Sequence, residues 1–284
     1  MMLPSIDQAE RDEGLHLVRS FERFGNVRVI RLALGDTVAA AVARLRATGR
    51  YEYVEPDYVR HVTVAPDDPR FSSQWGLNNT GDNGGIAGAD IDAEAGWNTL
   101  TSASGVIVGI VDSGALTTHE DLVANLWKNP SPGTTKSYAN GESATVEVDS
   151  LNGLNAVTGS GVPTDDVGHG THVSGIVGAV GDNDLGVSGV AWSVQLMELK
   201  FIDSSGSGVT SDELPCIEYA IAHGAKVLNA SFGDESFSQA EMDAIYAAGK
   251  AGVIFVCAAG NSSEDNDTSP FFPANYPLDN IIAV

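Results

Sequence analysis

The sequence predicts an α/β fold of three layers, in which a mainly parallel sheet is covered by helices on both faces. Short, continuous apolar runs recur between residues 105 and 284 and alternate with segments that have helical spacing. Strands that are apolar throughout are buried on both faces, which is typical of parallel sheets with helical crossovers. In such sheets the functional residues gather at the carboxyl ends of the strands.

Five apolar runs in the second part of the chain are the expected strands: GVIVGIVDSG (105–114), VQLMELKFID (194–203), AKVLNASFG (225–233), AGVIFVCAAGN (251–261) and NIIAV (280–284). The segments THVSGIVGAV, SDELPCIEYAIAHG and SQAEMDAIYAAGKAG lie between them and are expected to be helices. The stretch 129–163 is rich in Ser, Thr, Asn, Gly and Pro, which indicates a long surface loop.

The first 65 residues predict a small strand–helix–strand unit. Residues 27–34 alternate as a strand does, and Asp36 and Gly49 suit the N-cap and the C′ position of a helix between them. Residues 51–59 indicate a second strand, where Pro56 marks an edge or a strand end. A unit of this size is only marginally stable alone, so it is expected to be stabilised by contacts with the rest of the chain.

The distribution of charge indicates a domain boundary near residue 65. Residues 1–65 carry nine basic and nine acidic side chains, whereas residues 66–284 carry six basic and 29 acidic ones. The net charge of −23 argues against nucleic acid as a ligand, because phosphates would be repelled. The acid excess is interpreted as a solvated surface; the alternatives are solubility in salt or carboxylates reserved for Ca²⁺.

Composition excludes several further classes of protein. The longest apolar runs are too short to span a bilayer, so no membrane partner is expected. Two cysteines exclude a disulfide scaffold. Cys216, in a helix, and Cys257, in a strand, are interpreted as buried thiols, although a disulfide stays open. The opening MMLPSIDQAERDEG lacks the apolar core of a secretory signal, so the protein is either cytosolic or starts upstream.

Polar side chains follow three of the apolar elements and could meet in one cleft. Asp112 follows VIVGIV, His169 opens a helix of small residues, and Asn261 ends VIFVCAAGN. These groups can orient a base, move a proton and hold an oxyanion. Taken singly, each suits a structural role in a turn, a cap or a helix start. A zinc site at His169 and His172 is disfavoured because no third ligand is near.

The motifs together resemble the subtilisin-like serine proteases. They are DSGALTTHEDL (112–122), GHGTHVSGIVGA (168–179) and the AAGN turn (258–261), in that order, and the resemblance runs from about Pro66 to the end. It implies a subtilisin-like fold and a serine-type endopeptidase acting on polypeptide substrates. It also implies that His169 is the general base, that Asp112 orients and stabilises its imidazolium, and that Asn261 donates to the oxyanion.

The resemblance extends to substrate binding. SSGSG (204–208) and NASFG (229–233) resemble the two strands that accept an extended substrate through backbone hydrogen bonds, where glycine lets another backbone approach. The implied contacts are Gly206, Ser207 and Gly208 in the first segment and Ser231, Phe232 and Gly233 in the second. The family more often has Leu at position 232, so the size of the pocket for the residue before the scissile bond is open.

The N-terminal region resembles the end of a subtilase propeptide, which is an inhibitor and folding aid. The similar stretch is VIRLALGDTVAAAVARLRATGRYEYVEPDYV, and PDDPRFSSQWGLNNTG (66–81) resembles the start of a mature enzyme. The implied domains are a partial propeptide over 1–65, which would be the enzyme's own partner, and a peptidase domain over 66–284. The resemblance also implies secretion to the extracellular space.

A structural Ca²⁺ site is implied by the likeness to thermitase-type members. In these, the ligands come from an Asp near the mature N-terminus, an Asp nine residues after the catalytic Asp, and a loop after the histidine helix. The matching ligands are Asp68, Asp121, Asn183 and the carbonyl groups of Val180, Leu185 and Val187. Hard oxygen donors of this kind suit Ca²⁺. The alternative is that residues 182–184 only build a turn.

The sequence departs from the family pattern because it lacks the motif of the nucleophilic serine. A GTS-x-A-x-P motif carries the serine in this family, after the oxyanion Asn, and no such motif occurs in residues 1–284. We expect a truncated reading of a longer gene, with a fold incomplete at the C-terminus, the serine beyond Val284 and no activity in the fragment itself. The alternative is a non-catalytic peptide-binding or inhibitory pseudoprotease module that keeps the substrate strands.

Overall fold

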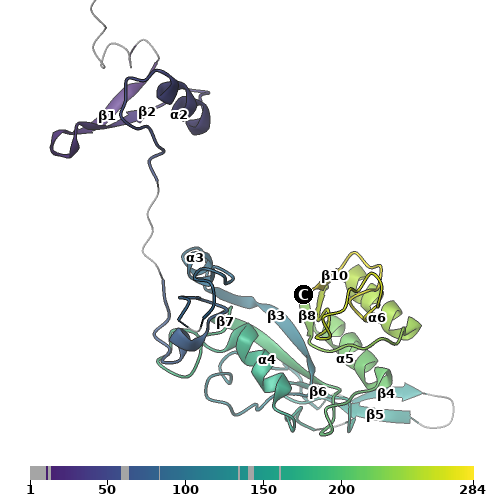
Figure 1. Cartoon of the computed structure of the whole chain (residues 1–284). Helices are drawn as coiled ribbons and strands as arrows, with labels where there is room; N and C mark the ends of the chain where they lie inside the picture. Colours follow the sequence, from purple (N-terminus) through teal and green to yellow (C-terminus); the bar gives the residue numbers. More distant parts are fainter. Residues whose placement is uncertain are drawn as a thin grey trace, which may run out of the picture. The chain divides into compact units, whose positions relative to one another are not determined.

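The computed structural model describes residue 11 and residues 14–58, 64–82, 84–133, 135–139, 144–159 and 161–284 (Figure 1). The chain divides into two compact units, Met1–Val62 and Thr63–Val284. No helix in these ranges is both long and apolar enough to cross a membrane.

The first unit pairs two antiparallel strands, β1 (His16–Phe21) and β2 (Val27–Arg31), joined by the 3₁₀ turn η1 (Glu22–Phe24), and adds the helix α2 (Val38–Ala47). The N-cap of α2 is Thr37, whose Oγ1 accepts a hydrogen bond from the Ala40 N–H at 3.3 Å, so the prediction of Asp36 was wrong by one residue. Asp36 instead forms an ion pair with Arg44, which lies in the second half of α2. Gly49 has a φ of +62°, as expected of a residue just after a helix.

The predicted strand over residues 51–59 is wrong for residues 51–58, which form no sheet; residue 59 lies outside the described part. Strand β2 pairs along one of its two edges with β1, a strand that was not predicted. A groove of about 680 Å³ is lined by β2 and by residues 50–57. Arg46 holds the segment through Nε, which donates to the Val54 carbonyl at 2.8 Å.

The second unit is built on a six-stranded, fully parallel sheet in the order β10-β9-β8-β3-β7-β6. The strands are β3 (Ser102–Asp112), β6 (Gly153–Asn155), β7 (Ser193–Lys200), β8 (Val227–Ala230), β9 (Ile254–Cys257) and β10 (Ile281–Ala283). Five of them confirm the predicted apolar runs. Because the strands are parallel, their carboxyl ends meet at one edge of the sheet.

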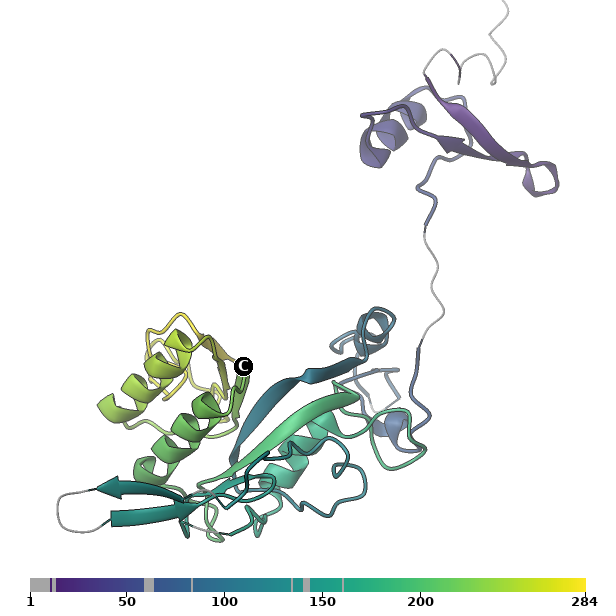
Figure 2. The same ribbon diagram turned by 180° about the vertical axis from the view of Figure 1, so that it is seen from behind.

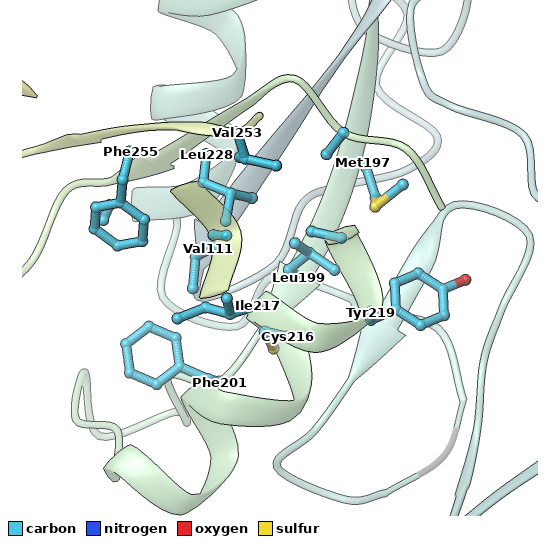
Figure 3. Close-up of a cluster of buried hydrophobic side chains, with 14 of the residues drawn as sticks. Val111, Met197, Leu199, Phe201, Cys216, Ile217, Tyr219, Leu228, Val253 and Phe255 are labelled. Atoms are coloured by element: carbon cyan, nitrogen blue, oxygen red, sulfur yellow. The ribbon is translucent and has the colours of Figure 1, made fainter. Parts of the chain in front are cut away.

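Helices cover both faces of this sheet, as predicted. α4 (His169–Gly178) packs on β3 and β7 on one face, and α5 (Thr210–Ala222) and α6 (Gln239–Lys250) pack on the other, an arrangement that Figures 1 and 2 show from opposite sides. The larger core cluster lies under α5 and α6, where Ile217 and Leu228 are buried (Figure 3). Two short helical segments, η2 (Phe71–Ser73) and α3 (Ala93–Trp97), precede the sheet.

The loop predicted over 129–163 is only partly a loop. Two antiparallel strands, β4 (Thr135–Ala139) and β5 (Ala144–Val148), form a hairpin, and β6 joins the edge of the main sheet. Strand β6 is three residues long, too short to leave a periodic signal. Gly153 makes the pairing possible, because its φ is +146° and a Cβ there would stand 1.8 Å from the Glu198 carbonyl oxygen.

Candidate active site

Asp112 and His169 meet at the carboxyl edge of the sheet. Asp112 is the last residue of β3 and is fully buried, and His169 is the first residue of α4, with its side chain 47% exposed. The Nδ1 atom of His169 lies 2.8 Å from Asp112 Oδ1 and 2.9 Å from Oδ2. Gly170 allows this approach, since a Cβ there would stand 2.1 Å from the Gly114 carbonyl oxygen.

The loop before α4 is organised by Asp165, which the sequence analysis did not single out. Its Oδ1 accepts hydrogen bonds from the backbone of Val167 and Gly168 and from Ser113 Oγ, and its Oδ2 accepts two from Thr171. Burial acts to raise the pKa of Asp165, but the hydrogen bonds from Thr171, Gly168 and Val167 outweigh it and lower the pKa to about 2. The loop that presents His169 is therefore held by a carboxylate that is ionised at neutral pH.

Ser113 stands next to Asp112 but has the wrong geometry for a nucleophile. Its side chain is fully buried, its Oγ donates to Asp165 at 2.8 Å, and the same oxygen accepts from the Gly170 N–H at 2.9 Å. Among the residues that the structure describes, no serine hydroxyl forms a hydrogen bond with Nε2 of His169.

Lys200 is a second residue that the sequence analysis missed. It ends β7, is almost fully buried, and its Nζ donates to the carbonyl oxygens of Ser113 and Ile202 and to Asp166 Oδ1, at 2.7–2.8 Å. This ammonium group ties the turn after β3 to the turn after β7. It supports the edge of the sheet on which Asp112 lies.

Asn261 lies four residues after β9, at the same edge of the sheet but two strands away from β3. It is exposed and forms no hydrogen bond with His169. A cavity of about 240 Å³ opens beside it. The residues lining the cavity are Glu235, Ala259, Gly260, Ser262, Ser263, Glu264, Asn266, Ser269 and Phe271.

The first predicted substrate segment is an exposed hairpin at the end of β7. The Asp203 N–H donates to the Ser207 carbonyl at 2.9 Å, and Gly206 turns the chain with a φ of +78°. Gly208 lies so close to Phe201 that a Cβ would stand 2.5 Å from the ring. Glycine is therefore required at 208 by packing within the chain as well as by any approaching backbone.

The second predicted segment follows β8. The backbone groups of Ser231, Phe232 and Gly233 form no backbone hydrogen bond to any described residue, which leaves them available to an added strand. The Phe232 ring lies edge-on against Phe201 at 4.6 Å between centroids, on the side of the larger core cluster. Gly233 abuts the ring of Phe271, which also lines the cavity beside Asn261.

The predicted calcium ligands come together from three distant parts of the chain. Asp68 and Asp121 are both nearly fully buried. Asp68 accepts hydrogen bonds from the backbone N–H groups of Asp182 and Asn183, at 2.9 and 3.3 Å. Asp121 accepts from the Val187 N–H at 2.9 Å and from the Asn183 side chain at 3.0 Å.

The donor chemistry of this loop suits Ca²⁺. The carbonyl oxygens of Val180, Leu185 and Val187 accept no hydrogen bond within the described ranges, and no lysine or arginine side chain forms an ion pair with Asp68 or Asp121 there. Only two of the predicted ligands, Asp68 and Asp121, are acidic side chains. The described residues contain no cluster of three or more His, Cys, Asp or Glu side chains that could hold a metal ion. The remaining ligands would be an amide and carbonyl groups, which Ca²⁺ accepts readily.

Cys216 and Cys257 are both buried, and no disulfide joins them. Burial, and then the charge of Glu241, raise the pKa of the Cys257 thiol to about 11. The interpretation as two buried thiols is confirmed. A thiol that stays protonated at neutral pH is a poor nucleophile.

The model of the subtilase family matches residues 103–284, and the chain belongs to the subtilase family. It is 29% identical over 248 residues to a thermophilic serine proteinase of Bacillus sp. strain AK1, covering 87% of this chain and 52% of that protein. It is 31% identical over 283 residues to an extracellular protease of Xanthomonas campestris pv. campestris, covering 90% and 46%.

Subtilisin DY of Bacillus licheniformis is 37% identical over 180 residues, covering 63% of this chain and 55% of that protein. The chain therefore spans about half the length of these relatives. Among solved structures, a protease of Pseudoalteromonas arctica PAMC 21717 superposes with a TM-score of 0.56 at 28% identity, covering 78% of this chain and 65% of that one. The resemblance to subtilisin-like proteases and the fold class are thus confirmed.

Proposed function

We propose that the protein is a serine endopeptidase that hydrolyses peptide bonds of polypeptide substrates, with His169 as the general base. The observation that carries this proposal is the contact of both Asp112 oxygens with His169 Nδ1, at 2.8 and 2.9 Å. A buried carboxylate in this position accepts a hydrogen bond from the Nδ1–H group, which fixes the imidazole tautomer and leaves the Nε2 lone pair free to take a proton.

The serine is supplied from outside residues 1–284. Nε2 of His169 takes the hydroxyl proton as the serine oxygen attacks the carbonyl carbon, and Asp112 stabilises the imidazolium. The Asn261 amide donates to the oxyanion of the tetrahedral intermediate. The imidazolium then gives its proton to the leaving amine, and the acyl-enzyme remains for hydrolysis. The substrate lies between Gly206–Gly208 and Ser231–Gly233.

The test compares three proteins on the same unstructured peptide substrate: the full-length protein, residues 1–284 alone, and full-length His169→Ala. We expect hydrolysis by the full-length protein alone. Residues 1–284 lack a serine in a suitable context and should show no turnover. Hydrolysis by full-length His169→Ala at the wild-type rate would contradict the assignment of the base, and turnover by residues 1–284 would contradict a serine outside them. A full-length protein that binds the peptide without cleaving it would establish the non-catalytic module instead.

Residues 1–65 are proposed as a propeptide that inhibits the enzyme and is removed by cleavage within 60–68. The support is the break in charge at residue 65, near which the two compact units also divide. N-terminal sequencing of the mature full-length enzyme should find its start in that stretch. A start well inside residues 80–284 would contradict the boundary, and failure of an active-site variant to lose the segment would confirm self-cleavage.

The enzyme is further proposed to act outside the cell and to hold one structural Ca²⁺ ion. Two of its relatives are named an extracellular protease and a cell wall-associated protease. The ion would be held by Asp68, Asp121 and the loop 180–187. It would neutralise two buried carboxylates that have no cationic side chain beside them among the described residues.

A further inference from the structure

A buried acid, Glu198, lies directly behind the candidate active site. It is in β7, where Val194 and Leu196 face the core cluster beneath α4, and side chains two apart in a strand point to the same face. Glu198 therefore occupies a position where the pattern of the strand calls for an apolar residue. Its side chain is fully buried.

Glu198 connects the strand to the helix that begins with His169. The Oγ of Ser174, a fully buried residue of α4, donates to both carboxyl oxygens of Glu198, at 3.1 and 3.2 Å. The backbone of β7 is held in place at this contact. The Glu198 N–H donates to the Asn152 carbonyl at 2.9 Å, and Gly153 packs against the Glu198 backbone. The middle of α4 is thereby tied to a fixed point in the sheet.

The charges around Glu198 favour its protonated form. Burial and, to a smaller extent, the charges of Asp112 and Asp165 together raise the pKa of Glu198 to about 8, although the hydrogen bond from Ser174 acts to lower it. The cation of its own strand, Lys200, is already engaged by Asp166 and two carbonyl groups. At neutral pH Glu198 is therefore mainly an uncharged acid.

On the basis of the proposed function, we propose that Glu198 is a positioning residue: through Ser174 it holds α4 so that His169 meets Asp112, and it does so as a neutral acid. Ionisation would place a second buried negative charge beside Asp112. The repulsion would loosen the packing of α4 on β7 and with it the alignment of His169.

The free energy of unfolding should depend on pH through the protonation of Glu198. The pKa of Glu198 is raised above its ordinary 4.5, so the folded state keeps a proton that the unfolded state releases. The free energy of unfolding should therefore fall as pH rises from about 4.5 to about 8, and level off above that. In Glu198→Gln, which keeps an acceptor for Ser174 but cannot ionise, this fall should be clearly smaller. The part that remains comes from the buried Glu213 and Glu241, whose pKa values burial also raises. The control Asp243→Asn removes an exposed acid of α6 and should keep the whole fall.

The kinetic test uses the full-length enzyme with Glu198→Gln and Glu198→Leu. The wild type should lose kcat above about pH 8, whereas Glu198→Gln should not. At pH 7, Glu198→Leu should lower kcat by roughly tenfold at unchanged KM, since it leaves the Ser174 hydroxyl buried without an acceptor, and Glu198→Gln should retain it.

Identical pH profiles for wild type and Glu198→Gln, in stability and in kcat, would overturn the proposal, as would full kcat in Glu198→Leu. The stability measurement needs no catalysis. A full-length protein without activity would therefore contradict the proposed function, while the stability profile would still decide whether Glu198 is a neutral acid.

Discussion

Asp112→Asn in the full-length enzyme is expected to lower kcat by about 10⁴-fold with little change in KM. Both carboxyl oxygens of Asp112 lie within 2.9 Å of His169 Nδ1. An amide in their place can point its NH₂ group at Nδ1, and the imidazole then carries its proton on Nε2. In that tautomer His169 cannot take a proton from serine.

The matched control is Asp166→Asn. Asp166 belongs to the loop before α4 and contacts Lys200 at 2.7 Å, but its side chain is 47% exposed. Without the Asp166 carboxylate, the buried Lys200 ammonium keeps its two carbonyl acceptors, and no contact with His169 is lost, so kcat should change less than about tenfold. Steady-state kinetics on one peptide substrate measures both variants. A kcat for Asp112→Asn within tenfold of the wild type would show that the Asp112–His169 contact is structural and does not carry catalysis.

The elements that the sequence predicted correctly are those with a strong local signal. Each of the five predicted strands is a continuous apolar run, and burial on both faces of a parallel sheet is what produces such runs. The same reasoning predicted that Asp112 and His169 lie close together, because a polar residue that ends a buried strand emerges at the carboxyl edge of the sheet. Asn261 lies there too, although nothing in its contacts distinguishes it from a turn residue.

The elements that the sequence missed depend on contacts between distant residues. Strand β6 has three residues and exists because Gly153 fits against the backbone of β7. Asp165 is one acid among many in a chain of net charge −23, and only its five hydrogen-bond donors set it apart. Glu198 is one of several polar residues in β7, and only its hydrogen bond with Ser174, 24 residues away in the sequence, sets it apart.

Removal of calcium is expected to lower the melting temperature of the full-length protein, and Asp121→Asn should abolish most of that effect. Asp68, Asp121 and the loop 180–187 are far apart in the chain, so an ion held by all three ties the start of the second unit to the turn after β3 and to the end of α4. Such an ion binds the folded state and not the unfolded one. A hundredfold excess over Kd then stabilises by about 2.7 kcal/mol.

The mutant separates this site from the general attraction of Ca²⁺ to an acidic surface. Melting temperatures are measured with calcium and with chelator for the wild type, Asp121→Asn and the exposed control Asp267→Asn. We expect the control to keep the full difference, because surface screening depends on total charge and one acid in 38 changes it little. If both variants keep the full difference, the effect is screening and these residues hold no ion. If Asp121→Asn removes the difference but Asp68→Asn does not, the ion is held by Asp121 and the loop 180–187, and the start of the second unit contributes no ligand.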